Sequence, residues 1–212
     1  MRTVPRSGED LFALAPVMPV VVLEEAEDAV PLARALVAGG LPGIEVTLRT
    51  PAALSGIERI AAEVPEAVVG AGTIVNAEQV EAATEAGARF LVSPGSTPDL
   101  LRAMFDTGLP CLPGVATVSE AMALMEWGTT SMKFFPAEAA GGTAFLKSLA
   151  GPLPQARLCP TGGITRRNAP DYLALPNVGC VGGSWPVPAA LIASGRWEEI
   201  TGLAREASSL RT

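Results

Sequence analysis

The sequence predicts an α/β fold, a single (β/α)₈ TIM barrel domain over residues 1–212 with a short N-terminal helix. Short apolar runs rich in Val, Ile and Leu occur eight times along the chain. Each run precedes a stretch with helical spacing of apolar residues, and successive runs start 20 to 26 residues apart. That spacing is about what one strand, one helix and two short loops occupy. Eight such units in 212 residues fit a small closed barrel.

The expected strands and helices follow from these runs and from the residues that separate them. The strands are expected at 17–23, 43–48, 67–71, 89–93, 109–113, 130–135, 156–161 and 178–183. A helix over 25–39 has one apolar stripe and stops at a pair of glycines. Thr50 is expected to cap the next helix, with Pro51 in its first turn.

Further caps are expected at Asn76 and Thr117, before helices over 77–87 and 118–127. Segment 9–15 is expected to form the N-terminal helix and to close the bottom of the barrel. An open doubly wound sheet is the alternative. Against it, the first strand is followed by Leu23-Glu24-Glu25, whose carboxylates would repel a dinucleotide pyrophosphate.

Composition excludes several classes of function. The chain has a net charge of −7 and no basic blocks, so we expect no nucleic-acid partner. It has no histidine, which excludes imidazole-based catalysis and imidazole metal sites. The three cysteines (Cys111, Cys159 and Cys180) are expected to be small buried hydrophobes in a reducing cytoplasm.

No membrane or secretory segment is expected. The longest early apolar run, residues 13–23, is 11 residues long and holds two prolines, so it is too short to span a bilayer. Glu9 and Asp10 stand where a secretory signal would carry basic residues.

Side-chain alternation places two opposite charges inside the barrel. In the second strand Ile44, Val46 and Leu48 suit the face beneath the helices, so Glu45, Thr47 and Arg49 must face inward. By the same alternation, Lys133 and Phe135 of the sixth strand face inward. Strands two and six are opposite in a ring of eight and contribute to the same interior layer. We therefore expect Glu45 and Lys133 to meet across the interior.

A buried lysine favours its neutral, nucleophilic form, because burial disfavours the charged ammonium. Lys133 is one of only two lysines, and the other, Lys147, falls in a predicted helix that can reach solvent. The alternative is a purely structural Lys133–Glu45 ion pair, although such buried pairs contribute little to stability.

Two glycine pairs follow the seventh and eighth expected strands, at Gly162-Gly163 and Gly182-Gly183. Phosphate sites of barrel enzymes are commonly built from these two loops. Arg49 suits a substrate carboxylate, and the Thr73 hydroxyl could bind the same group or simply start the next helix. Pro94 could shape the floor under a planar substrate, although it could equally serve only a turn.

Together these features indicate a small phosphorylated 2-keto acid substrate, cleaved through a lysine Schiff base with Glu45 moving the protons. Two other functions remain open. A phosphate-binding isomerase or epimerase would use Glu45 for enolisation and Lys133 only electrostatically. A sugar-acid-binding module would use neither residue for catalysis.

Six motifs closely resemble the class I 2-keto-3-deoxy-6-phosphogluconate (KDPG) and 4-hydroxy-2-oxoglutarate aldolases, from about Pro19 to Ala207. They are Glu45-Val46-Thr47-Leu48-Arg49-Thr50, Gly70-Ala71-Gly72-Thr73, Ser93-Pro94-Gly95, Lys133-Phe134-Phe135-Pro136-Ala137-Glu138, Pro160-Thr161-Gly162-Gly163-Ile164 and Gly182-Gly183-Ser184-Trp185. The sequence departs from the family at the end of the first strand, where we expect more basic residues than Leu23-Glu24-Glu25 supplies.

The resemblance implies cleavage to pyruvate and glyceraldehyde 3-phosphate in the Entner–Doudoroff route, without metal or other cofactor, by a homotrimer in a bacterial cytoplasm. It makes Lys133 the Schiff-base residue and Glu45 the proton shuttle. It also implies that Arg49 and Thr73 bind the pyruvyl carboxylate. The remaining site residues it implies are Pro94, Phe135 and Thr161 as lining, and Gly162, Gly163, Gly183 and Ser184 for the phosphate.

Overall fold

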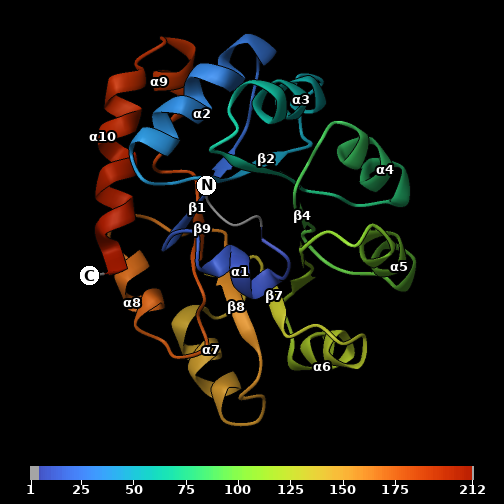
Figure 1. Cartoon of the computed structure of the whole chain (residues 1–212). Helices are drawn as coiled ribbons and strands as arrows, with labels where there is room; N and C mark the ends of the chain where they lie inside the picture. Colours follow the sequence, from blue (N-terminus) through green and yellow to red (C-terminus); the bar gives the residue numbers. More distant parts are fainter. Residues whose placement is uncertain (1–4, 212) are drawn as a thin grey trace.

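Parallel strands alternate with helices along the chain in a computed structural model that describes residues 5–211 (Figure 1). The strands are β1 (Val17–Val21), β2 (Gly43–Thr47), β3 (Val68–Gly72), β4 (Leu91–Val92), β5 (Cys111–Leu112), β6 (Gly114–Val115), β7 (Ser131–Phe134), β8 (Arg157–Pro160) and β9 (Val181–Gly183). The helices are α1 (Gly8–Phe12), α2 (Ala29–Ala38), α3 (Ala53–Glu63), α4 (Ala77–Glu85), α5 (Pro98–Asp106), α6 (Val118–Glu126), α7 (Gly142–Ala150), α8 (Ala169–Leu173), α9 (Ala189–Ala193) and α10 (Trp197–Ser208). Short 3₁₀ turns occupy Ala26–Asp28 and Ser209–Arg211. The predicted α/β alternation is confirmed.

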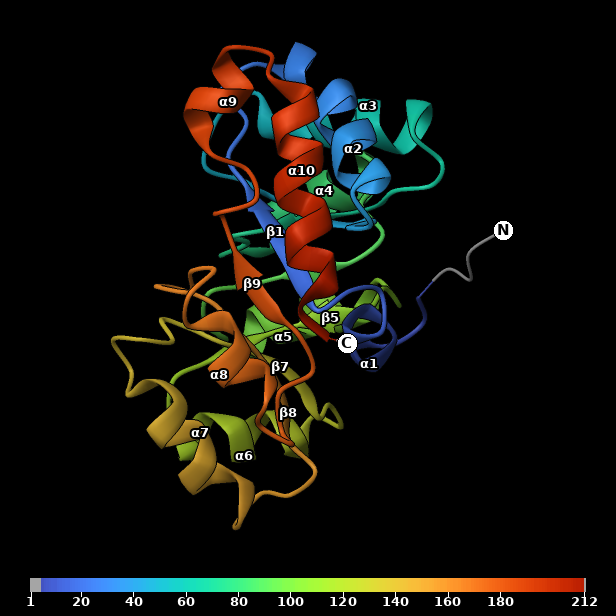
Figure 2. The same ribbon diagram turned by 90° about the vertical axis from the view of Figure 1, so that its left-hand side faces the viewer.

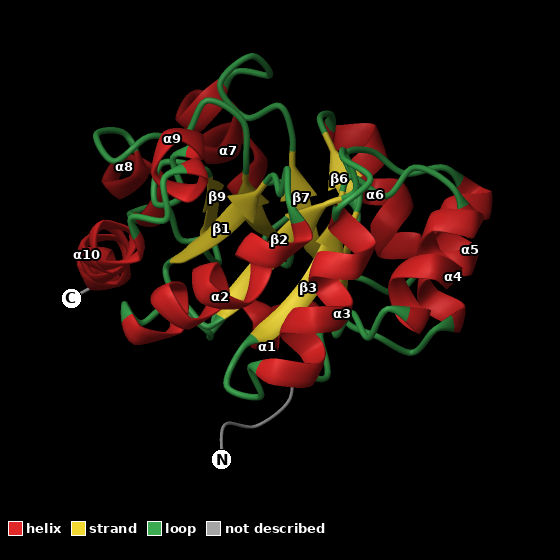
Figure 3. Ribbon diagram, turned by 90° about the horizontal axis from the view of Figure 1, so that it is seen from above, coloured by secondary structure: helices red, strands yellow, loops and turns green. Residues whose placement is uncertain are grey.

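The strands form two curled parallel sheets. One has the order β5-β4-β3-β2-β1-β9, and the other has the order β6-β7-β8. Isolated parallel bridges join Leu158 to Val178 and Thr161 to Gly182, between the β8 and β9 segments. The helices lie outside the strands (Figure 3).

The fifth expected strand, 109–113, is wrong in its extent. The structure has β5 at Cys111–Leu112 and a separate strand β6 at Gly114–Val115, which belongs to the other sheet. Pro113 separates them, because a proline has no N–H to donate to a neighbouring strand. Its carbonyl still accepts a hydrogen bond from the Lys133 N–H, at 2.9 Å.

The apolar residues form an outer and an inner layer. Ile44 and Val46 of β2 and Met132 and Phe134 of β7 belong to the large cluster beneath the helices, as the alternation predicts. Burial of such side chains stabilises the fold by about 1.5–3 kcal/mol each. The smaller inner cluster gathers side chains from β1, β3, β4, β5 and α1, among them Met18, Val68, Val92, Leu112, Leu11 and Phe12.

Helix α1 lies across one end of the strands, in the middle of the ring of outer helices (Figure 1). Ser7 caps it and forms a reciprocal capping box with Asp10. Leu11 and Phe12 are buried in the inner cluster. The helix covers Gly8–Phe12, compared with the expected 9–15.

The expected caps have different outcomes. Asn76 and Thr117 do cap α4 and α6 through their side chains. Thr50 does not cap α3, which begins later with Ala52 at its N-cap position and no side-chain cap. The Thr50 hydroxyl instead donates to the carbonyl of Leu23, at the end of the β1 segment. A tertiary contact thus outweighs the local capping preference.

The last α-helix of the described residues packs against an early one on the outer layer. Helix α10 lies beside α2 in both ribbon views (Figures 1 and 2). The Thr201 hydroxyl of α10 donates to the Ala35 carbonyl of α2 at 3.1 Å.

Candidate active site

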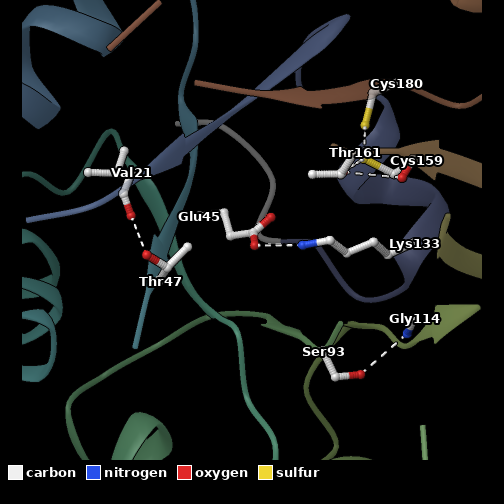
Figure 4. Close-up of polar contacts among 9 residues, drawn as sticks. All are labelled: Val21, Glu45, Thr47, Ser93, Gly114, Lys133, Cys159, Thr161 and Cys180. Atoms are coloured by element: carbon white, nitrogen blue, oxygen red, sulfur yellow. Dashed lines mark hydrogen bonds and ion pairs between the residues drawn. The ribbon is translucent and has the colours of Figure 1, made fainter. Parts of the chain in front are cut away.

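A buried ion pair joins opposite sides of the interior. Lys133 Nζ of β7 lies 3.0 Å from Glu45 Oε1 of β2, and the two side chains are only 6% and 3% exposed. Figure 4 shows the two side chains pointing toward each other. The contact predicted from strand counting is confirmed, across 88 positions of sequence.

The backbone around the pair holds both residues in place. Lys133 is paired with Gly114 on one side and with Cys159 on the other. On the β2 side, the Thr47 hydroxyl donates to the Val21 carbonyl at 2.8 Å and so ties β2 to β1 (Figure 4). These contacts fix the two strands, and the strands in turn fix the distance between the amine and the carboxylate.

A missing side chain provides the space for the carboxylate. A Cβ atom at Gly72, on the neighbouring strand β3, would lie 2.2 Å from Glu45 Oε1. Such a distance is far inside van der Waals contact, so only glycine at position 72 allows this Glu45 rotamer.

Above the ion pair, the loops after β8 and β9 surround a cavity of about 240 Å³. Of the predicted site residues it is lined by Arg49, Phe135, Thr161, Gly162, Gly163, Gly183 and Ser184. The ring centroid of Phe135 is 5.4 Å from Lys133 Nζ, which links the cavity to the amine. The two glycine loops and the one inward arginine are therefore brought together, as the sequence predicts.

Two predicted residues do not line this cavity. Thr73 follows β3 and has a φ of 60°, in the left-handed region that a threonine rarely adopts. Pro94 follows Ser93, whose Oγ accepts a hydrogen bond from the Gly114 N–H at 3.3 Å (Figure 4). Because Gly114 pairs with Lys133, this bond brings Pro94 to the strand next to the lysine.

The family model described as KDPG and KHG aldolase matches residues 9–203 of the chain. The chain belongs to this aldolase family. The KHG/KDPG aldolase of Escherichia coli strain K12 is 52% identical over 207 residues, which cover 98% of this chain and 97% of that relative. The 2-dehydro-3-deoxy-phosphogluconate aldolase of Dickeya dadantii is 51% identical over the same shares of the two chains.

Solved structures of the family superpose closely on this aldolase. A KDPG aldolase from Legionella pneumophila, with pyruvate captured as a covalent carbinolamine intermediate, has a TM-score of 0.94 and 48% identity over 96% of this chain and 98% of its own. The KDPG aldolase of Zymomonas mobilis ZM4 with 3-phosphoglycerate has a TM-score of 0.91 and 50% identity, over 97% of both chains.

The cysteines of this aldolase lie in the core, as predicted. Cys111, Cys159 and Cys180 are all buried, and none forms a disulfide. Burial raises the pKa of the Cys111 thiol to about 12, so it stays protonated and unreactive at neutral pH. The Sγ atoms of Cys159 and Cys180 lie 3.5 Å apart, and Cys159 Sγ lies 3.9 Å from Thr161 Oγ1 (Figure 4).

Among residues 5–211, no three His, Cys, Asp or Glu side chains are grouped so that they could hold a metal ion. The helices of that part of the chain are all too short or too polar to cross a membrane.

Sequence reasoning missed some residues of the site. Val20 and Val22 line the cavity from the β1 side. The alternation that places Val21 in the outer cluster could have identified them. Ile164 and Gly182 also line the cavity. The space that Gly72 leaves for Glu45 could not have been found, because it depends on the rotamer of a residue on another strand.

Proposed function

We propose that this chain cleaves 2-dehydro-3-deoxy-6-phosphogluconate to pyruvate and glyceraldehyde 3-phosphate through a Schiff base on Lys133. The observation that carries the proposal is the Lys133 amine, buried and 3.0 Å from the Glu45 carboxylate. The relatives are named for this activity, and the Legionella pneumophila relative holds pyruvate as a covalent carbinolamine. Cleavage of 4-hydroxy-2-oxoglutarate to pyruvate and glyoxylate is included, since a relative is named for that aldolase as well.

The chemistry begins at the lysine. Glu45 takes a proton from the Lys133 ammonium, and the freed amine attacks the C2 ketone to form a carbinolamine. Glu45 returns this proton as the carbinolamine loses water and becomes an iminium ion. Glu45 then takes the proton of the C4 hydroxyl, the C3–C4 bond breaks, and its electron pair passes to the iminium nitrogen. The aldehyde leaves, and an enamine of pyruvate stays on the lysine.

The second half of the reaction restores both residues. Protonated Glu45 returns its proton to C3 of the enamine, and water hydrolyses the resulting iminium to release pyruvate. One carboxylate suffices because the proton transfers occur in sequence. The proposal requires no cofactor, since the protonated imine nitrogen accepts the electrons of the broken bond.

The proposal also assigns residues to each part of the substrate. Arg49 and Thr73 bind the pyruvyl carboxylate, and Pro94, Phe135 and Thr161 line the site. Gly162, Gly163, Gly183 and Ser184 receive the phosphate. The cavity supports the phosphate assignment, because both glycine loops border it.

Incubation with pyruvate and sodium borohydride tests the proposed function. Borohydride reduces the iminium, so Lys133 should gain a stable pyruvyl group that peptide mass spectrometry locates. Lys147→Met, which removes the exposed second lysine, should leave the adduct unchanged, and Lys133→Met should abolish it. An isomerase or a binding module would give no adduct at Lys133, and that result would overturn the proposal.

The architecture and assembly are also part of the proposal. The two sheets are taken as one closed (β/α)₈ barrel in a single domain over residues 1–212. Its support is the pair of isolated bridges between the β8 and β9 segments and the continuous chain from β5 through Pro113 to β6. Residues 1–4 and 212 lie outside the described residues.

We further propose a homotrimer in the cytoplasm. Val118 and Met122 support an interface on α6, because they are 39% and 51% exposed and lie four residues apart on one helix face. The three buried thiols agree with a reducing compartment.

A further inference from the structure

The loop after β8 has two peptide groups whose orientation is fixed from behind. The Gly162 carbonyl accepts a hydrogen bond from the Glu138 N–H at 3.1 Å. The Gly163 carbonyl accepts one from Nδ2 of Asn168, also at 3.1 Å. Neither Glu138 nor Asn168 lines the cavity.

In a trans peptide the carbonyl and the following N–H point in opposite directions. Holding the Gly162 and Gly163 carbonyls from behind therefore turns the N–H groups of Gly163 and Ile164 the other way. Both residues line the cavity. Neither N–H donates to another group among residues 5–211. Two neighbouring amides thus present donors to whatever anion the cavity holds.

The Asn168 side chain is itself held in one orientation. Its Oδ1 accepts hydrogen bonds from the Thr165 N–H at 2.7 Å and from the Thr165 hydroxyl at 3.1 Å. With the oxygen so engaged, Nδ2 faces the Gly163 carbonyl. Asn168 stands at the N-cap position of α8 but makes no side-chain cap there. Its hydrogen bonds serve the loop instead of the helix.

Left-handed backbone at this point makes the arrangement possible. Gly162 has a φ of 101° and Gly163 a φ of 80°. Only glycine adopts such angles freely, so the loop has other conformations within reach. A side chain that ties the Gly163 carbonyl selects one of them.

We propose that Asn168 is a positioning residue for the phosphate of the substrate. Asn168 holds the Gly163–Ile164 peptide so that the Ile164 N–H points at the phosphate. The Asn168 side chain itself does not touch the ligand. The inference rests on the proposed function, and it adds a residue that acts on affinity for the phosphorylated substrate alone.

Asn168→Ala tests the inference through a comparison of two substrates. KM for 2-dehydro-3-deoxy-6-phosphogluconate should rise about tenfold with kcat little changed, because one amide donor is no longer aimed at the phosphate. The shorter dicarboxylate 4-hydroxy-2-oxoglutarate carries no phosphate, so its KM and kcat should change less than about twofold. Pyruvate trapping at Lys133 should also be unaffected. Ser7→Ala, which removes the cap of α1 at the other end of the strands, is the control for general destabilisation and should produce no such split between substrates.

Asn168→Asp is the second variant, since it keeps both bonds from Thr165 and loses only the amide donor. Its KM for the phosphorylated substrate should rise as well, and the rise should persist at about 0.5 M NaCl, where the added charge is largely screened. An equal loss on both substrates, or no change in KM in either variant, would overturn the role of Asn168. Failure of the wild-type chain to trap pyruvate would instead overturn the proposed function, so the two failures are distinguishable.

Discussion

At the scale of single residues, the site depends on an absent side chain as much as on the two charged ones. Gly72 lies on the strand next to Glu45, and a Cβ there would lie 2.2 Å from the carboxylate oxygen. The carboxylate would have to leave its place beside Lys133. In the proposed mechanism, position 72 therefore controls the proton transfers without carrying a reactive group.

Gly72→Ala should lower kcat by at least about tenfold, because a displaced base transfers protons poorly. Pyruvate trapping at Lys133 should be reduced less than turnover, since the amine itself remains. The matched control is Gly202→Ala on α10, where a Cβ would meet nothing within 4 Å. Steady-state kinetics of the two variants checks the prediction, and full activity of Gly72→Ala would contradict it.

The sequence predicted the contact between Glu45 and Lys133 but not the residues that support it. Glu45 and Lys133 were predicted because the two-residue period of a strand and the order of the strands determine which side chains face inward. Asn168 and Gly72 act through contacts between separate segments, which depend on rotamers and loop conformation. No local pattern in the sequence encodes those contacts.

At the scale of elements, α6 begins with a complete capping box. Thr117 Oγ1 accepts from the Glu120 N–H, while the Glu120 carboxylate accepts from the N–H groups of Ala116 and Thr117, at 2.8 and 2.9 Å. These hydrogen bonds hold the pKa of Glu120 below its usual value of 4.5, and the bond from the Ala116 N–H has the largest effect. A lowered carboxyl pKa stabilises the fold above the ordinary pKa, and the stabilisation is lost as the pH falls through the lowered value.

Glu120→Gln should therefore lower Tm by about 1–2 °C at pH 7, and the difference should shrink as the pH falls through the lowered pKa of Glu120. Once protonated, the wild-type carboxyl resembles the amide. Glu126→Gln at the other end of α6 is the control and should not lower Tm, since a negative charge there opposes the helix dipole. Thermal unfolding followed by circular dichroism measures both; a difference that grows toward acid would contradict the argument.

The two wrong predictions of elements have different causes. Thr50 has the residue type of a cap, yet its hydroxyl bonds to the Leu23 carbonyl of another segment. The run at 109–113 has the composition of one strand, yet Pro113 divides it between two sheets. A tertiary partner decides the first case and the missing N–H of a proline the second, whereas Asn76 and Thr117, whose partners are three residues away, were predicted correctly.

At the scale of the whole molecule, the regular spacing of strands predicted the parallel α/β arrangement. Each unit buries a strand beneath a helix and therefore has the same apolar pattern. The fold class can be predicted from that pattern even where the ends of single strands are predicted wrongly. How separate chains associate is a different matter, because an exposed apolar residue can be an interface or simply part of the surface. That question requires a measurement in solution.

Met122→Glu should convert the proposed trimer into smaller species, because a charge would be buried in the α6 interface. Size-exclusion chromatography with light scattering checks the result at matched concentrations. Leu54→Glu, at a 37% exposed apolar residue on α3, is the control and should stay trimeric. If the Leu54→Glu variant dissociated and the Met122→Glu variant stayed trimeric, the interface would lie on α3 and the proposal of α6 would be wrong.

The short helix α1 has a consequence for the order of events during turnover. Leu11 and Phe12 fill one end of the interior together with the inner apolar cluster. Substrate and products must therefore pass between solvent and Lys133 at the opposite end of the strands, beside the glycine loops. In the proposed mode of binding, the phosphate lies at these glycine loops, so the phosphorylated aldehyde is nearest to the open end while pyruvate is still bound to Lys133. The proposed mechanism therefore releases the aldehyde first and pyruvate last.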